Sequence, residues 1–215
     1  MRTIRFLFDF ISPYAYIAWT QIHTLAEQNG AEVVPEPILF AALLNTLGHK
    51  GPAEIPPKRA YVFKDAYRKA HTLGVPIAPP ATHPFNPLAA LRAAAANPDR
   101  RLIDALYRAT WVEGRRVDLP EVVADITRAA GFEVVVDDAV KAKLKANTDR
   151  ALADGAFGVP TMILDTHAAP EVATHELFWG VDALPHLEAF LQGRDPVPSD
   201  VFARWGGLPA SASRT

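Results

Sequence analysis

The first forty residues show, in turn, the apolar–polar patterns of a strand, a helix and a second strand. Residues 3–10 alternate β-branched and aromatic side chains with polar ones before becoming apolar, which predicts a first strand. Residues 13–28 have apolar positions at helical spacing and end at an Asn-Gly pair that suits a helix C-terminus. Residues 31–40 predict a second strand, which Pro35 makes irregular or places near a sheet edge. A unit of this order favours parallel strands joined by a right-handed crossover.

The middle of the chain prefers helix, and strand patterns return only after it. Each helical segment ends at a glycine, an asparagine or a proline-rich break. The predicted helices of this block cover 41–47, 58–74, 87–97, 99–114, 119–131 and 137–155. Two further strands are expected over 159–165 and 174–180, with a turn around 168–171 between them, followed by a last helix over 183–193.

These elements predict one α/β fold in which the early and late strands belong together. Two strands cannot form a stable core alone, so the two pairs must join in one four-stranded sheet. The predicted organisation is a discontinuous domain, residues 1–40 plus 155–215, with an all-helical insertion domain at 41–154. Neither a glycine-rich dinucleotide motif nor a phosphate-binding loop occurs in the sequence.

Composition and charge narrow the functional classes. Apolar residues make up 49% and charged residues 21% of the 215, as in an ordinary globular protein. The formal net charge of −2 argues against nucleic acid as a partner. No apolar stretch reaches the roughly 18 residues of a membrane span, and the N-terminal residues lack a signal-peptide cleavage pattern. We therefore expect a cytoplasmic protein with no membrane partner.

Cysteine is absent from the sequence, which decides what sulfur chemistry is open to this chain. Disulfides, Cys-x-x-Cys redox centres, cysteine nucleophiles and thiolate metal sites are all excluded. Any reactive sulfur must therefore arrive with a ligand. The seven histidines form no tight ligand set, and His167 and His175 flank the predicted turn at exposed positions, so we predict no metal.

Two short motifs, on this split layout of strands, carry a resemblance to a known superfamily. Residues 12–15 (Ser-Pro-Tyr-Ala) follow the first strand, and residues 158–161 (Gly-Val-Pro-Thr) precede the third. The arrangement resembles disulfide-oxidase-like members of the thioredoxin superfamily, which have a Cys-Pro-x-Cys turn facing a cis Val-Pro bond. This resemblance implies a thioredoxin-like domain with a four-stranded mixed sheet. Because Ser12 and Ala15 stand at the cysteine positions, the chain is not expected to be a disulfide oxidoreductase.

Five longer segments give a more specific resemblance, to 2-hydroxychromene-2-carboxylate isomerases and the related kappa-class glutathione transferases. They run in the family's order along most of the chain: 8–16, 48–76, 83–92, 155–163 and 178–184. The resemblance implies glutathione as cofactor and a small aromatic compound as substrate. Relatives of this kind are commonly dimers, so a homodimer is possible.

Ser12 has two interpretations, one structural and one catalytic. A serine at N-cap followed by proline at the first helical position is a common helix start. The resemblance implies instead that the hydroxyl donates a hydrogen bond to the thiolate of bound glutathione. Such a bond to a charged acceptor is worth roughly 1.5–3 kcal/mol, and a helix N-terminus adds about 0.3–1 kcal/mol. Lowering a thiol pKa from ~8.5 by two units needs about 2.7 kcal/mol, so these magnitudes suffice.

The other glutathione contacts are implied by the same resemblance. Val159 and Pro160 would form a cis bond that turns the Val159 backbone toward the cysteinyl part of glutathione, like an added strand. Val181 and Asp182 would meet the γ-glutamyl end, with free helix amides taking its carboxylate and Asp182 its ammonium. An N-cap role for Asp182 is equally compatible with its position before the last helix.

The segments of the predicted insertion supply further candidates. Lys58 begins a helix and is either a solvated lysine or, by resemblance, a contact for the glycine carboxylate of glutathione. His49 stands in Gly-His-Lys where the family pattern usually reads Gly-Asn-Lys, so its contact with the peptide differs from the pattern. Tyr14, Asn86 and Trp111 are candidates for binding the second substrate, with helix packing or turn formation as the alternative for each.

The leading hypothesis is a glutathione-dependent isomerase of an aromatic catabolic intermediate. It would convert a compound like 2-hydroxychromene-2-carboxylate into one like trans-o-hydroxybenzylidenepyruvate, by reversible thiolate addition, bond rotation and elimination. One alternative is a kappa-like glutathione transferase or peroxidase, which consumes the thiol instead of recycling it. Another is a non-catalytic thioredoxin-fold binding protein that has lost its redox cysteines.

Overall fold

Four strands form one mixed sheet in the computed structural model, which describes residues 2–166, 174–198 and 208. The strands are β1 (Arg2–Phe8), β2 (Ala31–Pro37), β3 (Thr161–Thr166) and β4 (Thr174–Trp179), in the spatial order β2-β1-β3-β4. β1 pairs with β2 in parallel, and β3 runs antiparallel to both β1 and β4. The predicted four-stranded mixed sheet is thereby confirmed. Pro35 lies in edge strand β2, where a missing N–H is tolerated.

The predicted helices are present, with ends that shift by up to a few residues. They are α1 (Pro13–Gln28), α2 (Phe40–Thr46), α3 (Pro56–Thr72), α4 (Leu88–Ala96), α5 (Arg100–Trp111), α6 (Pro120–Ala129), α7 (Asp138–Ala153) and α8 (Leu184–Leu191), with short 3-10 turns η1 (Pro52–Glu54) and η2 (Val181–Ala183). α3 starts earlier than predicted because its two prolines fill the first helical positions, where no N–H is needed. The turn around 168–171 and His167 lie outside the described residues. His175 is exposed, as predicted.

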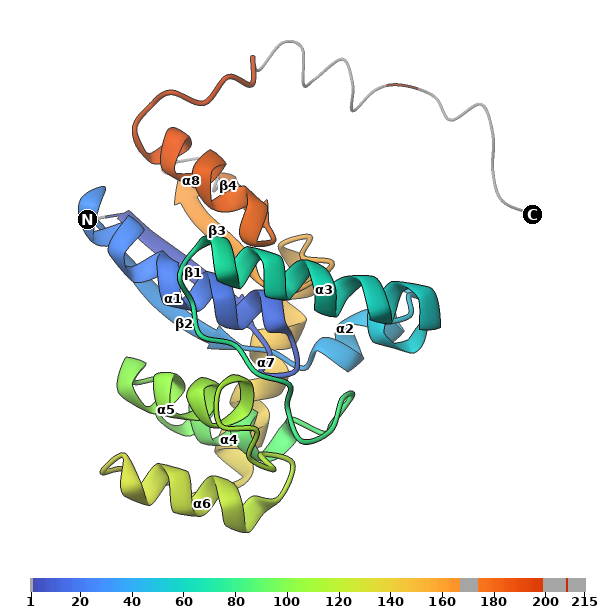
Figure 1. Cartoon of the computed structure of the whole chain (residues 1–215). Helices are drawn as coiled ribbons and strands as arrows, with labels where there is room; N and C mark the ends of the chain where they lie inside the picture. The colour runs from blue at the N-terminus through green and yellow to red at the C-terminus, as the bar shows by residue number, and fades with distance from the viewer. Residues whose placement is uncertain (1, 167–173, 199–207, 209–215) are drawn as a thin grey trace.

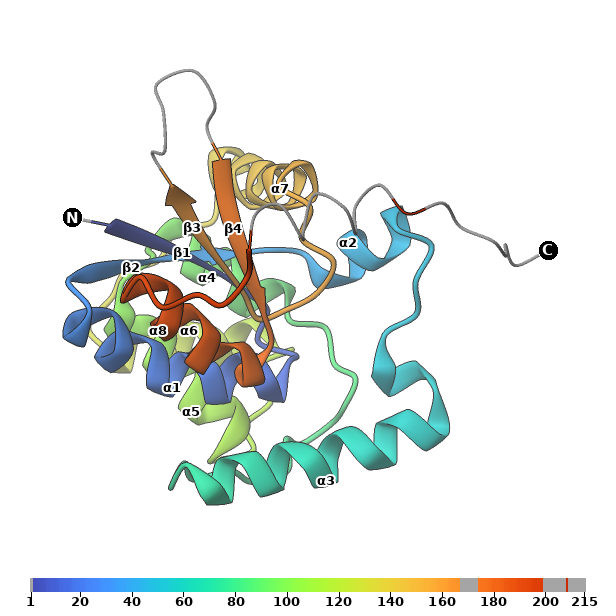
Figure 2. The same cartoon turned by 90° about the horizontal axis from the view of Figure 1, so that it is seen from above.

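Helices cover both faces of the sheet, and the alternation along β1 decides what each face buries. Ile4, Phe6 and Phe8 point into the larger core, which includes the apolar side of α1. Leu7 points the other way, into a smaller cluster with residues of α2 and α7. Figure 2 shows this layering, with α1 and α8 on one side of the sheet and α7 on the other. No helix in the described stretches is long and apolar enough to cross a membrane.

An aromatic cluster joins the inserted helices to the sheet. The rings of Phe8 and Phe10 lie 5.9 and 4.7 Å, centroid to centroid, from that of Tyr107 on α5. Trp19 of α1 completes the cluster at 5.9 Å from Phe8. Figure 1 shows α4, α5 and α6 grouped at one end of the sheet, where this shared core forms. The helices are inserted between β2 and β3 as predicted, and their division into a separate domain stays a prediction.

A charged group is buried on the α7 side of the sheet. Arg5 of β1 is 8% exposed and donates to Glu36 of β2 at 2.9 Å and to Asp154 after α7 at 2.6 Å. Arg150 of α7 also donates to Glu36, which is 4% exposed. Arg5 and Glu36, the two buried charges of this group, therefore have partners of opposite charge, which is the condition for tolerating ions in a protein interior.

Candidate functional site

The turn between β1 and α1 is held by the side chain of Asp9. Its two carboxylate oxygens accept from the backbone N–H groups of Ile11 at 3.0 Å and of Phe40 at 3.2 Å. The Asp9 carbonyl accepts from the backbone N–H of Ser12 at 3.1 Å. These bonds fix the chain direction at the point where α1 begins, and they tie that point to the start of α2.

Ser12 is the N-cap of α1, as predicted, and it is 7% exposed. Its Oγ accepts from the backbone N–H of Ala15 at 3.2 Å, and its proton is directed to the carbonyl of Val159 at 3.4 Å. That second bond is long, at the weak end of hydrogen-bond geometry. The capping role uses the oxygen and leaves the proton for a better acceptor, so the two interpretations of Ser12 are compatible.

The segment facing Ser12 is the bond between Val159 and Pro160, which is cis as the resemblance implied. The carbonyl of Pro160 accepts from the backbone N–H of Gly180 at 2.9 Å, which brings the start of η2 beside this bond. Three predicted site residues, Ser12, Val159 and Pro160, therefore come together from distant parts of the sequence. With Val181 and Asp182 in η2 they outline one corner of the molecule.

Asp182 does not cap the last helix. It lies within η2, and the position before α8 makes no side-chain capping bond, because a 3-10 turn separates Asp182 from the helix. The N-cap interpretation of this residue is therefore wrong. Its side chain is 80% exposed and contacts Lys69 of α3, with 3.4 Å between Nζ and Oδ1.

Lys69 belongs to a charged group that joins α1, α3 and η2. Its Nζ donates to Asp65 at 2.7 Å and lies 5.8 Å from the centre of the Tyr14 ring. The Tyr14 hydroxyl also donates to Asp65, at 2.8 Å. Partial burial acts to lower the pKa of Lys69, but the hydrogen bond to Asp65 and the charge of Asp182 outweigh it and raise that pKa. The lysine is therefore a fixed cation.

Burial also shifts the carboxyl of Asp9. Its complete desolvation raises the pKa of Asp9 to about 7, although the bonds from Ile11 and Phe40 act to lower it. The buried Tyr107 hydroxyl is close enough for the charge of Asp9 to contribute to the raised pKa of that tyrosine, after desolvation. This carboxyl is hydrogen-bonded to the backbone N–H of Ile11, the residue next to Ser12.

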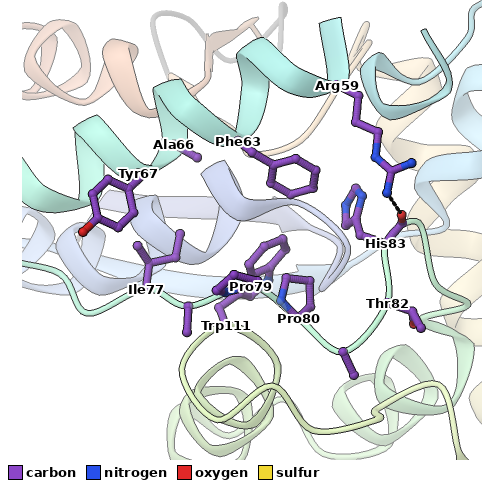
Figure 3. A pocket seen from close by; sticks show the side chains of 12 residues that line it. Arg59, Phe63, Ala66, Tyr67, Ile77, Pro79, Pro80, Thr82, His83 and Trp111 are labelled. Atoms are coloured by element: carbon purple, nitrogen blue, oxygen red, sulfur yellow. Dashed lines mark hydrogen bonds between the residues drawn. The ribbon is translucent and has the colours of Figure 1, made fainter. Parts of the chain in front are cut away.

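A cavity of about 470 Å³ opens between α3 and the proline-rich segment that follows it. Figure 3 shows Phe63 and Tyr67 of α3 on one side, with Ile77, Pro79 and Trp111 across from them. The full lining is Arg59, Phe63, Ala66, Tyr67, Ile77, Ala78, Pro79, Pro80, Ala81, Thr82, His83 and Trp111. Its walls are mainly apolar and aromatic, with one cationic side chain at the rim.

Two cavity residues hold the backbone just ahead of Ser12. The indole N–H of Trp111 donates to the carbonyl of Phe10 at 2.9 Å, and Nε2 of His83 lies 3.0 Å from the carbonyl of Ile11. Arg59 in turn donates to the carbonyl of His83 at 2.5 Å (Figure 3). The cavity therefore adjoins the Ser12 turn through direct hydrogen bonds.

A family model described as a DSBA-like thioredoxin domain matches residues 3–192. The chain belongs to this DSBA-like thioredoxin family. It is 29% identical over 200 residues to a 2-hydroxychromene-2-carboxylate isomerase of Sphingobium xenophagum, covering 88% of this chain and 98% of that protein. It is 28% identical to glutathione S-transferase kappa 2 of Caenorhabditis elegans, covering 88% and 92%. The resemblance inferred from the sequence motifs is thereby confirmed.

The solved structure of a 2-hydroxychromene-2-carboxylate isomerase has the same fold as this DSBA-like chain. The TM-score is 0.75 at 23% identity, and the match covers 97% of this chain and 100% of that one. Because the sequence identity is low, this likeness supports the fold alone. Among the residues described here, no group of three or more His, Asp or Glu side chains is placed to hold a metal ion.

The remaining predicted residues of this DSBA-like chain lie in different places. Trp111 is 1% exposed and lines the cavity. Tyr14 faces Asp65, and Asn86 instead accepts from the backbone N–H of Leu88 at 3.1 Å at the start of α4, outside the cavity lining. His49 and Lys58 are exposed on either side of η1. Within the described part of the chain, no hydrogen bond joins either side chain to the Ser12 corner.

Sequence reasoning missed several residues of the site. His83 begins the segment 83–92 that carries part of the resemblance, but nothing local indicates that it holds the Ile11 carbonyl. Because a carbonyl only accepts, Nε2 of His83 carries the proton, and its buried Nδ1 makes no hydrogen bond to any described residue. Burial and the nearby charge of Arg59 lower the pKa of His83, although the bond to Ile11 opposes this. The ring is therefore neutral at pH 7.

Lys69 and Asp9 each carried a visible signal in the sequence. Asp65 and Lys69 have the i,i+4 spacing of a helical ion pair. Asp9 interrupts the run FLFDFI, and an acidic residue between buried aromatic residues needs partners. Neither signal says which distant group completes the contact.

Proposed function

We propose that this protein is a glutathione-dependent isomerase of an aromatic catabolic intermediate. The substrate would resemble 2-hydroxychromene-2-carboxylate and the product trans-o-hydroxybenzylidenepyruvate. The observation that carries the proposal is the buried Ser12 hydroxyl, at a helix N-terminus, opposite the cis Val159–Pro160 bond and beside an apolar cavity. Relatives at 29% and 28% identity carry isomerase and kappa transferase names, which supports the same class.

The residues at this corner fit a thiol peptide. Ser12 would donate its proton to a thiolate while Ala15 continues to donate to its oxygen. Only the 3.4 Å bond to Val159 is lost, and that bond is weak. The backbone of Val159 would pair with the cysteinyl part of glutathione, as an added strand pairs with a sheet. Lys58 and His49 would act on the glycine end, and Val181 and Asp182 on the γ-glutamyl end.

The energy that this arrangement supplies matches what thiol activation needs. A free thiol with a pKa of ~8.5 is only a few per cent ionised at neutral pH. A charge-assisted bond from Ser12 is worth roughly 1.5–3 kcal/mol, and the N-terminus of α1 adds about 0.3–1 kcal/mol. Their sum lowers the pKa by about two units, because each unit corresponds to 1.36 kcal/mol.

The hydroxychromene ring would open by cleavage of its hemiketal C–O bond, with the hemiketal proton passing to the released phenol oxygen. Bound glutathione would supply a thiolate that adds to the conjugated carbon, allows rotation about the resulting single bond and leaves unchanged. The residues of this chain would position the substrate and glutathione and exclude water from them. The aromatic walls of the cavity, Phe63 and Trp111 among them, would stack on the substrate ring. Arg59 at the rim would attract its carboxylate.

The test compares three forms of Ser12: the wild type, Ser12→Ala and Ser12→Thr. Conversion of 2-hydroxychromene-2-carboxylate is followed by its absorbance, with and without glutathione. The pKa of bound glutathione is measured from the thiolate absorbance near 240 nm. We expect Ser12→Ala to lose roughly 10- to 100-fold in rate and to raise the thiol pKa by one to two units. Ser12→Thr keeps the hydroxyl and should therefore retain much of the wild-type rate and much of the lowered thiol pKa. Full glutathione-dependent activity in Ser12→Ala would refute the role of the hydroxyl.

The kappa transferase alternative is supported by the Caenorhabditis elegans relative. Measuring the thiol content during turnover distinguishes the two functions, because an isomerase returns its glutathione and a transferase or peroxidase consumes it. A cytoplasmic location and a homodimeric state, which relatives of this kind suggest, form part of the same proposal. Sedimentation of the purified chain tests the second.

A further inference from the structure

Lys69 is an element of the site that the glutathione contacts named so far leave without a role. Its ammonium is held by Asp65 at 2.7 Å and reaches Asp182 at 3.4 Å. Its side chain is 23% exposed, whereas that of Asp182 is 80% exposed. The cation is therefore anchored from α3 beneath an acidic group that faces outward.

The structure offers few other partners for the carboxylate of a γ-glutamyl group. Free helix amides are the expected ligand, but η2 has only three residues, and one of its N–H groups, that of Ala183, already donates to Gly180 at 3.3 Å. α8 begins after this turn with Pro185 among its first residues, which removes a further donor. A cationic side chain next to Asp182 is a better match for a carboxylate.

We propose that Lys69 binds the α-carboxylate of the γ-glutamyl group while Asp182 binds its α-ammonium, so that α3 and η2 together recognise a free α-amino acid. The inference rests on the proposed binding of glutathione and deepens it. The two opposite charges of the protein, 3.4 Å apart, are complementary to the adjacent opposite charges of an amino acid head.

A purely structural role explains Lys69 less well. An ion pair with a largely exposed carboxylate contributes little to stability, because water and salt screen it. The position of the Lys69 ammonium is nevertheless fixed. One of its three N–H groups donates to Asp65, which also accepts from the Tyr14 hydroxyl at 2.8 Å. With a second donor on Asp182, a third remains for a ligand oxygen. Binding of the ammonium to the open side of Asp182 leaves this arrangement intact.

The experiment is a cycle between a protein variant and a ligand variant. Calorimetry measures the binding of glutathione, and of glutathione whose γ-glutamyl α-carboxylate is replaced by a carboxamide, to wild type and to Lys69→Met. Wild type should bind glutathione about tenfold more tightly than the carboxamide, whereas Lys69→Met should bind both equally and weakly. Lys64→Met, which changes an exposed lysine of the same helix, is the control and should behave as wild type. Circular dichroism checks the fold of both variants.

Each outcome bears on one proposal. If Lys69→Met weakens the binding of both ligands by the same factor, the tenfold preference for glutathione is kept. That result would show that the lysine acts through structure, which overturns the inference. If the wild type binds neither ligand at millimolar concentration, the proposed function itself fails. Binding with no discrimination by wild type leaves glutathione use standing and removes only the role of Lys69.

Discussion

Replacing Asp9 with asparagine should remove a pH dependence from the stability of the protein. Burial raises the pKa of Asp9 from its ordinary 3.8 to about 7 in the folded chain. Between these two pH values the folded state binds more protons than the unfolded state, so stability falls as pH rises. Below pH 4 the carboxyl is neutral in both states, and above pH 7 the full cost of burying its charge is present. Asparagine cannot ionise, so position 9 of the variant contributes no pH dependence to the free energy of unfolding.

The size of the effect follows from the difference in pKa. At 1.36 kcal/mol per pH unit, a rise from 3.8 to about 7 corresponds to about 4 kcal/mol over the whole range. From pH 5 to pH 8 the change is roughly 3 kcal/mol. Asparagine also has only one acceptor oxygen for the N–H groups of Ile11 and Phe40, so one bond is lost at a cost of about 1–3 kcal/mol at every pH.

Urea unfolding followed by circular dichroism at pH 5, 6, 7 and 8 measures both terms. The free energy of unfolding of wild type minus that of Asp9→Asn should decrease by roughly 3 kcal/mol across this range. Other titrating groups are shared by the two proteins and cancel. Asp125→Asn, at an exposed position on α6, should parallel the wild type at all four pH values. A difference between wild type and Asp9→Asn that does not vary with pH would refute the assignment of a raised pKa to this carboxyl.

Three further substitutions test other contacts. Arg5→Met should lower the free energy of unfolding by up to about 3 kcal/mol, because Asp154 loses its cationic partner and buried Glu36 keeps only Arg150; a loss below 1 kcal/mol in urea unfolding would contradict this. Trp111→Phe removes the indole donor to the turn and part of the cavity wall, so we expect substrate KM to rise several-fold with a stability loss of about 1–2 kcal/mol; unchanged kinetics would exclude Trp111 from the substrate site. Gly158→Ala places a methyl group 2.4 Å from Nε1 of Trp179, so this half-exposed indole must move and the fluorescence maximum of the protein should shift. A fluorescence spectrum identical to that of wild type would contradict this close contact.

The architecture could be predicted because each element carries its own pattern. Alternation along β1, helical spacing in α1, and the proline in edge strand β2 are all local, and the need to complete a four-stranded sheet follows from them. The N-cap position of Ser12 was equally local, since serine before proline suits the start of a helix.

The site was less predictable because its contacts join elements far apart in the chain. Lys69 meets Asp182 only when α3 has packed beside η2, and no spacing in the sequence expresses that distance. The cavity is walled by a proline-rich segment that lacks any periodic pattern, so its shape depends on packing against α3 and Trp111. The N-cap interpretation of Asp182 failed for a local reason, because a 3-10 turn lies between this residue and α8.

The ring cluster of Phe8, Phe10, Trp19 and Tyr107 has a consequence for recombination among relatives. Because a tyrosine from α5 fills the space beneath β1, the inserted helices do not form an exchangeable cassette. A chimera that takes residues 41–154 from a relative with another substrate would bring its own side chain against these aromatic rings. Such transplants should succeed only when β1, α1 and α5 are exchanged together, so new specificities in this fold would arise through the cavity lining more readily than by swapping the whole insertion.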